Sequence, residues 1–246
     1  IMYIENMDQK KFKILIGIAY SIILVYFLYE LLSRVSFEDI TSYSFVQSYQ
    51  DKLESFKSKN IFALIIIFII FANIWVLMLG FGTPIAIISG FIFGKWAGTL
   101  LAALSLSTGS LMLYFLAKYF FYNFLKEKYY NKFIFLNKLF INNELIVMII
   151  FRFVGLVPFF LANLIPVIFN IKPFNYFFGT ILGILPSVFI FVSLGSGFSS
   201  AMYSHDSYPS IIELIKIPEI YLPIIGFFII VVLSYFLRKK FFKIKQ

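Results

Sequence analysis

The sequence RFVGLVPFFLANLIPVIFNIKPFNYFFGTILGILPSVFIFVSLGS, residues 152–196, is apolar almost throughout. Its second part, 174–196, is a clean run interrupted only by Pro186, and it exceeds the about 20 residues that a helix needs to cross a bilayer. Its first part belongs to the apolar segment 145–171, which Arg152, Pro158, Asn163 and Pro166 break up. Because an exposed broken backbone is not tolerated in lipid, we expect 145–171 to form a re-entrant hairpin. A kinked full span is the alternative.

A second broken apolar segment lies upstream. Residues 80–95, GFGTPIAIISGFIFGK, contain Pro84 and several glycines, and the run 96–118 that follows is long enough to span. Pro84 precedes Gly109 by 25 residues, and Pro158 precedes Gly183 by 25 residues. One hairpin plus one span makes a single crossing, so two copies would lie in opposite orientations. The sequence therefore predicts an inverted repeat of two opposed re-entrant hairpins.

Three further apolar runs, 14–32, 61–79 and 219–237, predict membrane spans. The expected fold is an all-α polytopic membrane protein with about five transmembrane helices and the two hairpins. We expect three regions: an N-terminal span with a polar extramembrane segment (1–60), a membrane core (61–200), and a polar loop, last span and basic tail (201–246). Residues 119–143 mix aromatic residues with lysines, which predicts an interfacial segment with basic anchors.

The composition excludes several classes of protein. Of the 246 residues, 61% are hydrophobic and 13% are charged, which is incompatible with a soluble or a disordered protein. Cysteine is absent and His205 is the single histidine, so we expect no metal, no cofactor and no enzyme activity. The net charge of +9 is typical of lysines and arginines facing anionic lipid rather than nucleic acid.

Cations without nearby acids point to a binding site. No acidic residue occurs between Glu54 and Glu127, or between Glu144 and Asp206. The guanidinium of Arg152 is suited to hold a phosphate through two hydrogen bonds. Alternatively, it bonds helix-end carbonyls, reaches toward the membrane surface, or pairs with an acid such as Glu144.

The other candidate binding residues are Pro84, Gly90, Gly94 and Lys95 in the first broken segment, and Pro158 and Asn163 in the second. For Lys95, a position at the membrane boundary is the favoured alternative. For Asn163 the favoured alternative is capping of a short helix. The prolines have a simple structural alternative, because they shape turns. Gly90, Gly94 and Gly98 recur every four residues, which suits close helix packing in lipid.

At these residues the sequence resembles the DedA/VTT superfamily, also called SNARE-associated Golgi-protein domains, in its bacterial branch rather than DedA proper. The resemblance covers roughly residues 60–200. It rests on GFGTPIAIISGFIFGKWAGTLLAALSLSTGS, residues 80–110, and on the stretch 152–196. The positions that fall on the pattern of the second stretch are Arg152, Pro158, Asn163, Gly183, Pro186 and Gly195. Gly109 is the later glycine of the first stretch.

Several positions depart from the family pattern. Gly155, Val167 and Ser187 stand where proline, glycine and glycine are common, and the acidic residue of the first hairpin of DedA proper is absent. The resemblance implies opposed re-entrant hairpins and movement of lipids across a bilayer, such as phospholipid scrambling or recycling of an isoprenoid-phosphate carrier. Proton-dependent transport has also been proposed for bacterial relatives, but the missing carboxylate argues against that coupling here.

The leading hypothesis is a lipid translocator of the bacterial cytoplasmic membrane. Its partners would be membrane lipids with anionic head groups, held by a cationic interior, and a homo-oligomer is compatible with the sequence. The alternatives are an ion-coupled transporter of a small solute and a membrane scaffold that transports nothing.

Overall fold

A computed structural model describes residues 43–155, 157–204 and 216–241, together with Ile22, Tyr26 and Tyr29. The chain divides into two compact units, residues 1–54 and 55–246, and each is considered by itself. In the first unit, Ile22, Tyr26 and Tyr29 are helical, and α3 begins at Tyr43. The second unit holds both sites discussed below.

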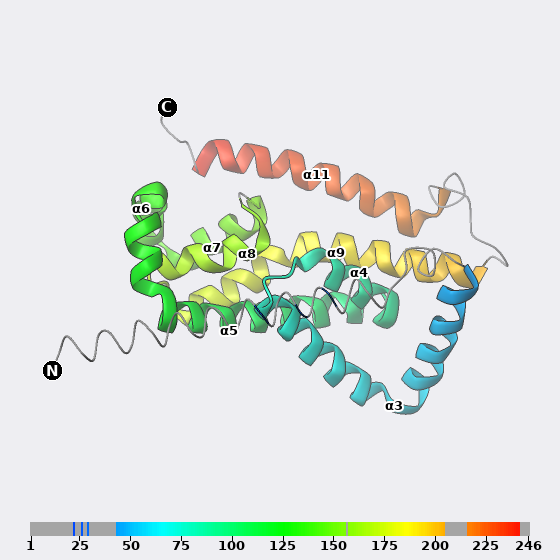
Figure 1. Ribbon diagram of the computed structural model, residues 1–246. Helices are drawn as coiled ribbons and strands as arrows, with labels where there is room; N and C mark the ends of the chain where they lie inside the picture. Colours follow the sequence, from blue (N-terminus) through cyan, green and yellow to red (C-terminus); the bar gives the residue numbers. More distant parts are fainter. Residues whose placement is uncertain are drawn as a thin grey trace. The chain divides into compact units, whose positions relative to one another are not determined.

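All regular structure in the described ranges is helical (Figure 1). The helices are α3 (Tyr43–Leu77), α4 (Gly82–Phe93), α5 (Lys95–Tyr129), η1 (Asn131–Phe133), α6 (Ile134–Asn142), α7 (Glu144–Val154), α8 (Phe159–Ile168), α9 (Pro173–Ser204) and α11 (Pro218–Phe241). Helix α3 contains a kink at Asn60, where the backbone leaves helical values. The all-α prediction is confirmed for these residues.

Among the described residues, four helices are long and apolar enough to cross a membrane: Lys52–Leu77, Lys95–Tyr129, Pro173–Ala201 and Pro218–Phe241. They coincide with the predicted spans 61–79, 96–118, 174–196 and 219–237. The predicted span 14–32 lies outside the described residues except for three positions, and His205 and Asp206 lie outside them entirely. From its sequence, the segment 197–218 is expected to form a polar loop, and this expectation is wrong at its start, because α9 continues to Ser204.

The two broken segments fold into short helices. Residues 80–95 form the single helix α4 between two turns, whereas 144–171 form α7, a turn and α8. At 1.5 Å per residue, α4 and α8 are about 18 and 15 Å long, roughly half of a hydrocarbon core about 30 Å thick. Neither short helix is long enough to cross a bilayer by itself.

The same order of elements occurs twice. A helix, a turn, a short helix, a break and a long helix follow one another in α3–α4–α5 and again in α7–α8–α9. The backbone is left-handed at Leu79 and Gly155 before the two short helices, and at Gly94 and Asn170 after them. Each of these pairs is separated by the same number of residues. The order of helices and left-handed turns is therefore repeated along the chain, and the opposed orientation of two re-entrant hairpins stays a prediction.

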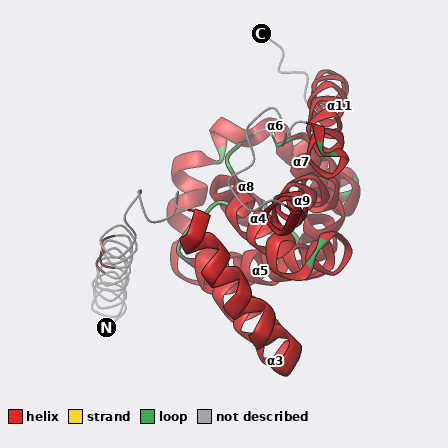
Figure 2. Ribbon diagram, turned by 90° about the vertical axis from the view of Figure 1, so that its right-hand side faces the viewer, coloured by secondary structure: helices red, strands yellow, loops and turns green. Residues whose placement is uncertain are grey.

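Helix α9 is central to the second unit, because it packs against α4, α5, α7 and α11 (Figures 1 and 2). Its closest approach is to α4. A Cβ atom at Gly90 of α4 would meet the carbonyl of Val192, and one at Gly195 of α9 would meet the carbonyl of Ile87. The two backbones thus touch directly, which only glycine permits at these positions.

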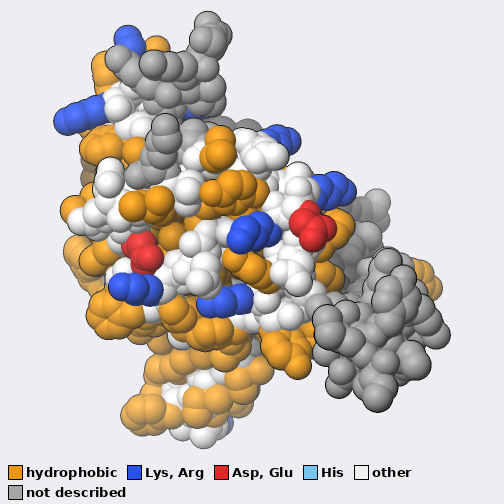
Figure 3. All heavy atoms as spheres, turned by 90° about the vertical axis from the view of Figure 1, so that its left-hand side faces the viewer, with side chains coloured by type: hydrophobic (Ala, Val, Ile, Leu, Met, Phe, Trp, Pro, Cys, Tyr) orange, Lys and Arg blue, Asp and Glu red, His pale blue; other side chains and the backbone are white. Residues whose placement is uncertain are grey.

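One end of the molecule combines charged and apolar side chains. The face in Figure 3 shows lysine or arginine and acidic side chains among hydrophobic ones. In the chain, the last turn of α5 contains Lys126 and Lys128, and η1 contains Lys132. These residues lie in the segment 119–143, for which the sequence predicts basic anchors at the membrane surface.

Candidate functional site

Arg152 lies in the last turn of α7, which ends at Gly155 in the left-handed conformation. The side chain is only 6% exposed. Its Nε donates to the Thr180 hydroxyl at 3.2 Å, and its Nη2 donates to the Tyr176 hydroxyl at 2.9 Å. The guanidinium also lies over the rings of Phe159 and Tyr176, at 5.6 and 5.4 Å from their centroids. Two of the alternatives considered for Arg152 are therefore wrong: a guanidinium bonded to helix-end carbonyls, and a side chain that reaches toward the membrane surface.

No carboxylate neutralises this buried cation within the described part of the chain. Glu144, the acid considered from the sequence, lies eight residues away on α7, about 12 Å along the axis. Its carboxylate instead accepts from the Lys172 backbone N–H at 3.1 Å and from Asn175 at 2.7 Å. The proposed pairing of Arg152 with Glu144 is therefore wrong. Through these two hydrogen bonds, Glu144 instead stabilises the start of α9.

One nitrogen of the guanidinium, Nη1, is buried and has no hydrogen-bond partner among the residues that the structure describes. Burying an unpaired charged donor costs several kcal/mol unless a partner is supplied. Arg152 also lines a pocket of about 180 Å³. An incoming anion would give the guanidinium both a counter-charge and an acceptor.

The beginnings of two short helices contribute to the same pocket. Gly82 and Thr83 come from the first turn of α4, and Phe159 is the first residue of α8. Neither helix has a side-chain cap at this end, so backbone N–H groups remain available there. A helix N-terminus favours negative charge. The remaining wall is apolar apart from Ser187, and Thr83 and Gly155 are exposed at its rim.

A buried polar network surrounds Arg152, and Tyr176 of α9 is its central residue. The Tyr176 hydroxyl, besides accepting from Arg152, lies 3.2 Å from the Ser110 carbonyl and 3.4 Å from the Asn163 carbonyl. Its ring stacks on Tyr114 at 4.7 Å, and the Tyr114 hydroxyl donates to the Ile171 carbonyl at 2.6 Å. The network therefore links α5, α7, α8 and α9 around the guanidinium.

Sequence reasoning missed Tyr176 and Thr180. A signal was present, because Tyr176, Thr180 and Gly183 follow the spacing i, i+4, i+7 and share one face of α9. A Cβ atom at Gly183 would meet the Cβ of Arg152, so this face packs directly on α7. A glycine and two hydroxyl-bearing residues in that register were thus an available signal for a helix face that receives a buried arginine.

Replacing Tyr176 with phenylalanine should lower the free energy of unfolding by about 1–3 kcal/mol, because the buried Nη2 of Arg152 would lose its acceptor. The measurement is the thermal unfolding of the purified protein in detergent. Tyr221→Phe is the matched control, since Tyr221 is 37% exposed and should cost little. Equal unfolding temperatures for the two variants would contradict the supporting role of Tyr176.

The structure does not bring all candidate binding residues to the Arg152 pocket. Pro84 lies in the first turn of α4, next to lining residues, and Pro158 precedes α8. Gly94 forms the left-handed break between α4 and α5. Lys95 lines a different pocket, beside α9 and α11. Only Arg152 among the candidates lines the pocket described above.

Asn163 lies in the middle of α8, which begins after Pro158 and ends before Phe169. The preferred interpretation, a helix cap, is therefore wrong. The side chain is fully buried, its Oδ1 lies 3.5 Å from the Tyr176 hydroxyl, and its Nδ2 has no partner. Asn163 thus borders the network behind Arg152 rather than the pocket.

The glycines named from the sequence serve contacts between helices. Gly90 and Gly195 join α4 and α9, Gly183 joins α9 and α7, and a Cβ atom at Gly109 would meet Val76 of α3. The regular spacing of Gly90, Gly94 and Gly98 does not form one helical stripe, because Gly94 interrupts the helix. Pro186 lies inside α9.

Comparison with known proteins agrees with this architecture. The sequence model of the VTT-domain family matches residues 79–197, which run from the turn before α4 into the second half of α9. The match includes Arg152 and every helix that lines its pocket. No similar protein was found among the curated proteins, and no similar fold among the solved structures. The apolar spanning helices and the domain match together make this chain an integral membrane protein that carries, at residues 79–197, a VTT domain of the DedA/SNARE-associated family.

Proposed function

We propose that this membrane protein translocates lipids, and that the Arg152 pocket binds the phosphate of the head group while the acyl chains remain in the membrane. The observation that carries the proposal is the buried Nη1 of Arg152, which has no partner and belongs to a side chain lining a pocket. A phosphate oxygen is the acceptor that a guanidinium favours. The beginnings of α4 and α8 favour the same charge.

The short helices support a path for the head group. Because α4 and α8 span only about half of a hydrocarbon core about 30 Å thick, a re-entrant position would bring their N-terminal ends toward its middle. Helix α4 packs on α9 and α8 packs on α5, so each short helix contacts the long helix of the other half. This reciprocal packing favours the opposed arrangement expected of an inverted repeat. We place the protein in a bacterial cytoplasmic membrane, as the family resemblance implies.

Purified protein in liposomes should move fluorescent phospholipid between leaflets without an energy source. Chemical quenching of the outer leaflet would then remove well over half of the fluorescence, whereas protein-free liposomes would stop near half. Phospholipid and isoprenoid-phosphate probes should be compared, because both carry the phosphate that the pocket would bind. Quenching that stops near half for every probe would overturn passive translocation, and uptake driven by a pH gradient would then favour a solute transporter.

A further inference from the structure

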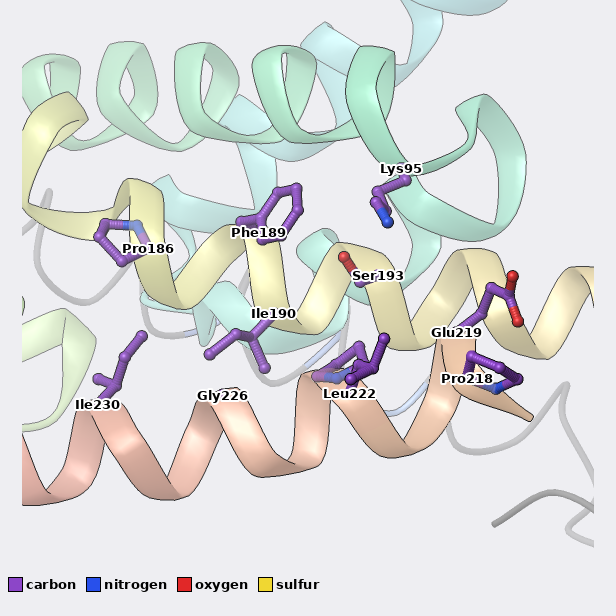
Figure 4. Close-up of a pocket in the computed structure, with 11 residues that line it drawn as sticks. Lys95, Pro186, Phe189, Ile190, Ser193, Pro218, Glu219, Leu222, Gly226 and Ile230 are labelled. Carbon is purple, nitrogen blue, oxygen red and sulfur yellow. The ribbon is translucent and has the colours of Figure 1, made fainter. Parts of the chain in front are cut away.

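A second and larger pocket lies on the other side of α9. It is a groove of about 460 Å³ between α9 and α11, with Lys95 from the start of α5 at one end (Figure 4). Its size is within the range of about 300–1,000 Å³ for sites that hold small molecules. The lining is mostly apolar, with Pro186, Phe189, Ile190, Leu222 and Ile230 among its residues.

The polar residues of the groove gather at one end, as Figure 4 shows for Lys95, Ser193 and Glu219. The Lys95 amine lies over the rings of Trp96 and Phe189, at 5.6 and 5.7 Å from their centroids. Neither the Lys95 amine nor the Glu219 carboxylate forms a salt bridge or a hydrogen bond among the described residues. Ser193 is 3% exposed, and its hydroxyl has no partner. A cation, an anion and a buried hydroxyl are thus all available to a ligand.

The position of the groove matches one leaflet of a bilayer. Lys95 begins α5 and Glu219 lies in the first turn of α11, so the polar end coincides with the N-terminal ends of two spanning helices. From Glu219 to Ile230 the groove follows α11 for about 17 Å, roughly half of a hydrocarbon core about 30 Å thick. A head group would therefore lie at the membrane surface and a chain would reach toward the middle.

We propose that this groove binds one phospholipid whose head group carries both a phosphate and a primary ammonium. Lys95 would bind the phosphate, and Glu219 would accept from the ammonium. Ser193 would donate to an oxygen of the phosphate or of the adjoining ester. An anionic head group without an amine would leave Glu219 facing negative charge, and a choline has no N–H to donate.

This site is separate from the Arg152 pocket. The groove uses Pro186, Phe189 and Ile190 of α9, whereas the Arg152 pocket uses Ser187 and Val188. Lipid binding in the groove requires neither Arg152 nor translocation. The two proposals can therefore fail independently.

Trp96 provides a direct reporter of the groove, because its ring lies 5.4 Å from that of Phe189. With Trp75→Phe as the background, Trp96 is the remaining tryptophan, and lipids with brominated acyl chains quench it on contact. Brominated phosphatidylethanolamine, phosphatidylglycerol and phosphatidylcholine are titrated in bilayers of unbrominated phosphatidylcholine. We expect phosphatidylethanolamine to bind roughly tenfold more tightly than the other two, as charge-assisted hydrogen bonds allow. Equal quenching by all three, or a preference for phosphatidylglycerol, would overturn the proposal.

Three substitutions test the assigned roles. Lys95→Gln should weaken binding of all three lipids, because each of them carries the phosphate. Glu219→Gln should remove most of the preference for phosphatidylethanolamine over both other lipids, because this preference depends on the carboxylate that accepts from the ammonium. Gly226→Leu should weaken binding of all three lipids, because the space beside Gly226 within the groove would be filled. Lys118→Gln is the matched control, as Lys118 also lies on α5 but outside the groove. A Glu219→Gln protein that keeps the full preference, or a Lys95→Gln protein that binds all three lipids as tightly as the wild type, would overturn the assignment. A preference kept in Arg152→Met would separate it from the translocation proposal.

Discussion

Replacing Arg152 with methionine should slow phospholipid translocation in liposomes at least tenfold while the protein remains folded. A hydrogen bond to a charged group contributes about 1.5–3 kcal/mol, and about 1.4 kcal/mol corresponds to a tenfold change. Methionine keeps much of the side-chain volume but removes the cation. Methionine also removes a buried charge that has no counter-charge, and an unchanged unfolding temperature would show that a slower rate reports lost phosphate binding rather than unfolding.

Two further variants complete this test. Arg152→Lys keeps the charge but loses the planar pair of donors, so we expect a rate between those of the wild type and Arg152→Met. Lys118→Met removes a cation from α5 outside the Arg152 pocket and should translocate at the wild-type rate. The unfolding temperature of each variant is measured beside its rate. A wild-type rate for Arg152→Met would eliminate Arg152 from the proposed mechanism, even if the protein proves to be a translocator.

The spanning helices were predictable because the bilayer imposes a length and an apolar composition that a single sequence reveals. The end of α9 was not predictable in this way. Residues 197–204, GFSSAMYS, contain a glycine and three serines, which are frequent in loops, yet they continue the helix. Gly197 explains the difference, because a Cβ atom there would meet the Glu219 carbonyl of α11. Packing against a partner about 20 residues away thus overrides local preference.

In the functional site, too, the residue that its own segment reveals was predictable, whereas the residues whose role depends on a facing helix were not. Arg152 was recognisable because an unpaired charge in an apolar segment is costly and demands an explanation. Tyr176 and Thr180 were not recognised, since the chain contains 16 tyrosines and a hydroxyl gains its role only from the helix that faces it. The pairing with Glu144 failed for a geometric reason, because eight residues of helix place the two groups at opposite ends of α7.

The contact between α4 and α9 should be the structural feature most sensitive to a single methyl group. At Gly90 and at Gly195 an added Cβ atom would collide with a backbone carbonyl of the facing helix, which cannot rotate away. We expect Gly90→Ala and Gly195→Ala each to lower the free energy of unfolding by about 1–3 kcal/mol. Thermal unfolding in detergent measures the effect. Gly226→Ala is the matched control, because its Cβ atom would lie at an ordinary 3.4 Å from Ile190.

The double variant distinguishes a shared interface from two local clashes. Gly90 contacts Val192 and Gly195 contacts Ile87, so both substitutions push the same two helices apart. Once one added methyl group has moved α4 away from α9, the second methyl group clashes less with the facing carbonyl and costs less stability. The combined loss of stability should therefore be smaller than the sum of the single losses, by at least the 0.5 kcal/mol that marks coupled sites. If the two losses of stability were strictly additive, each clash would be relieved by a local shift of the backbone. Helix α4 would then not move as one body against α9.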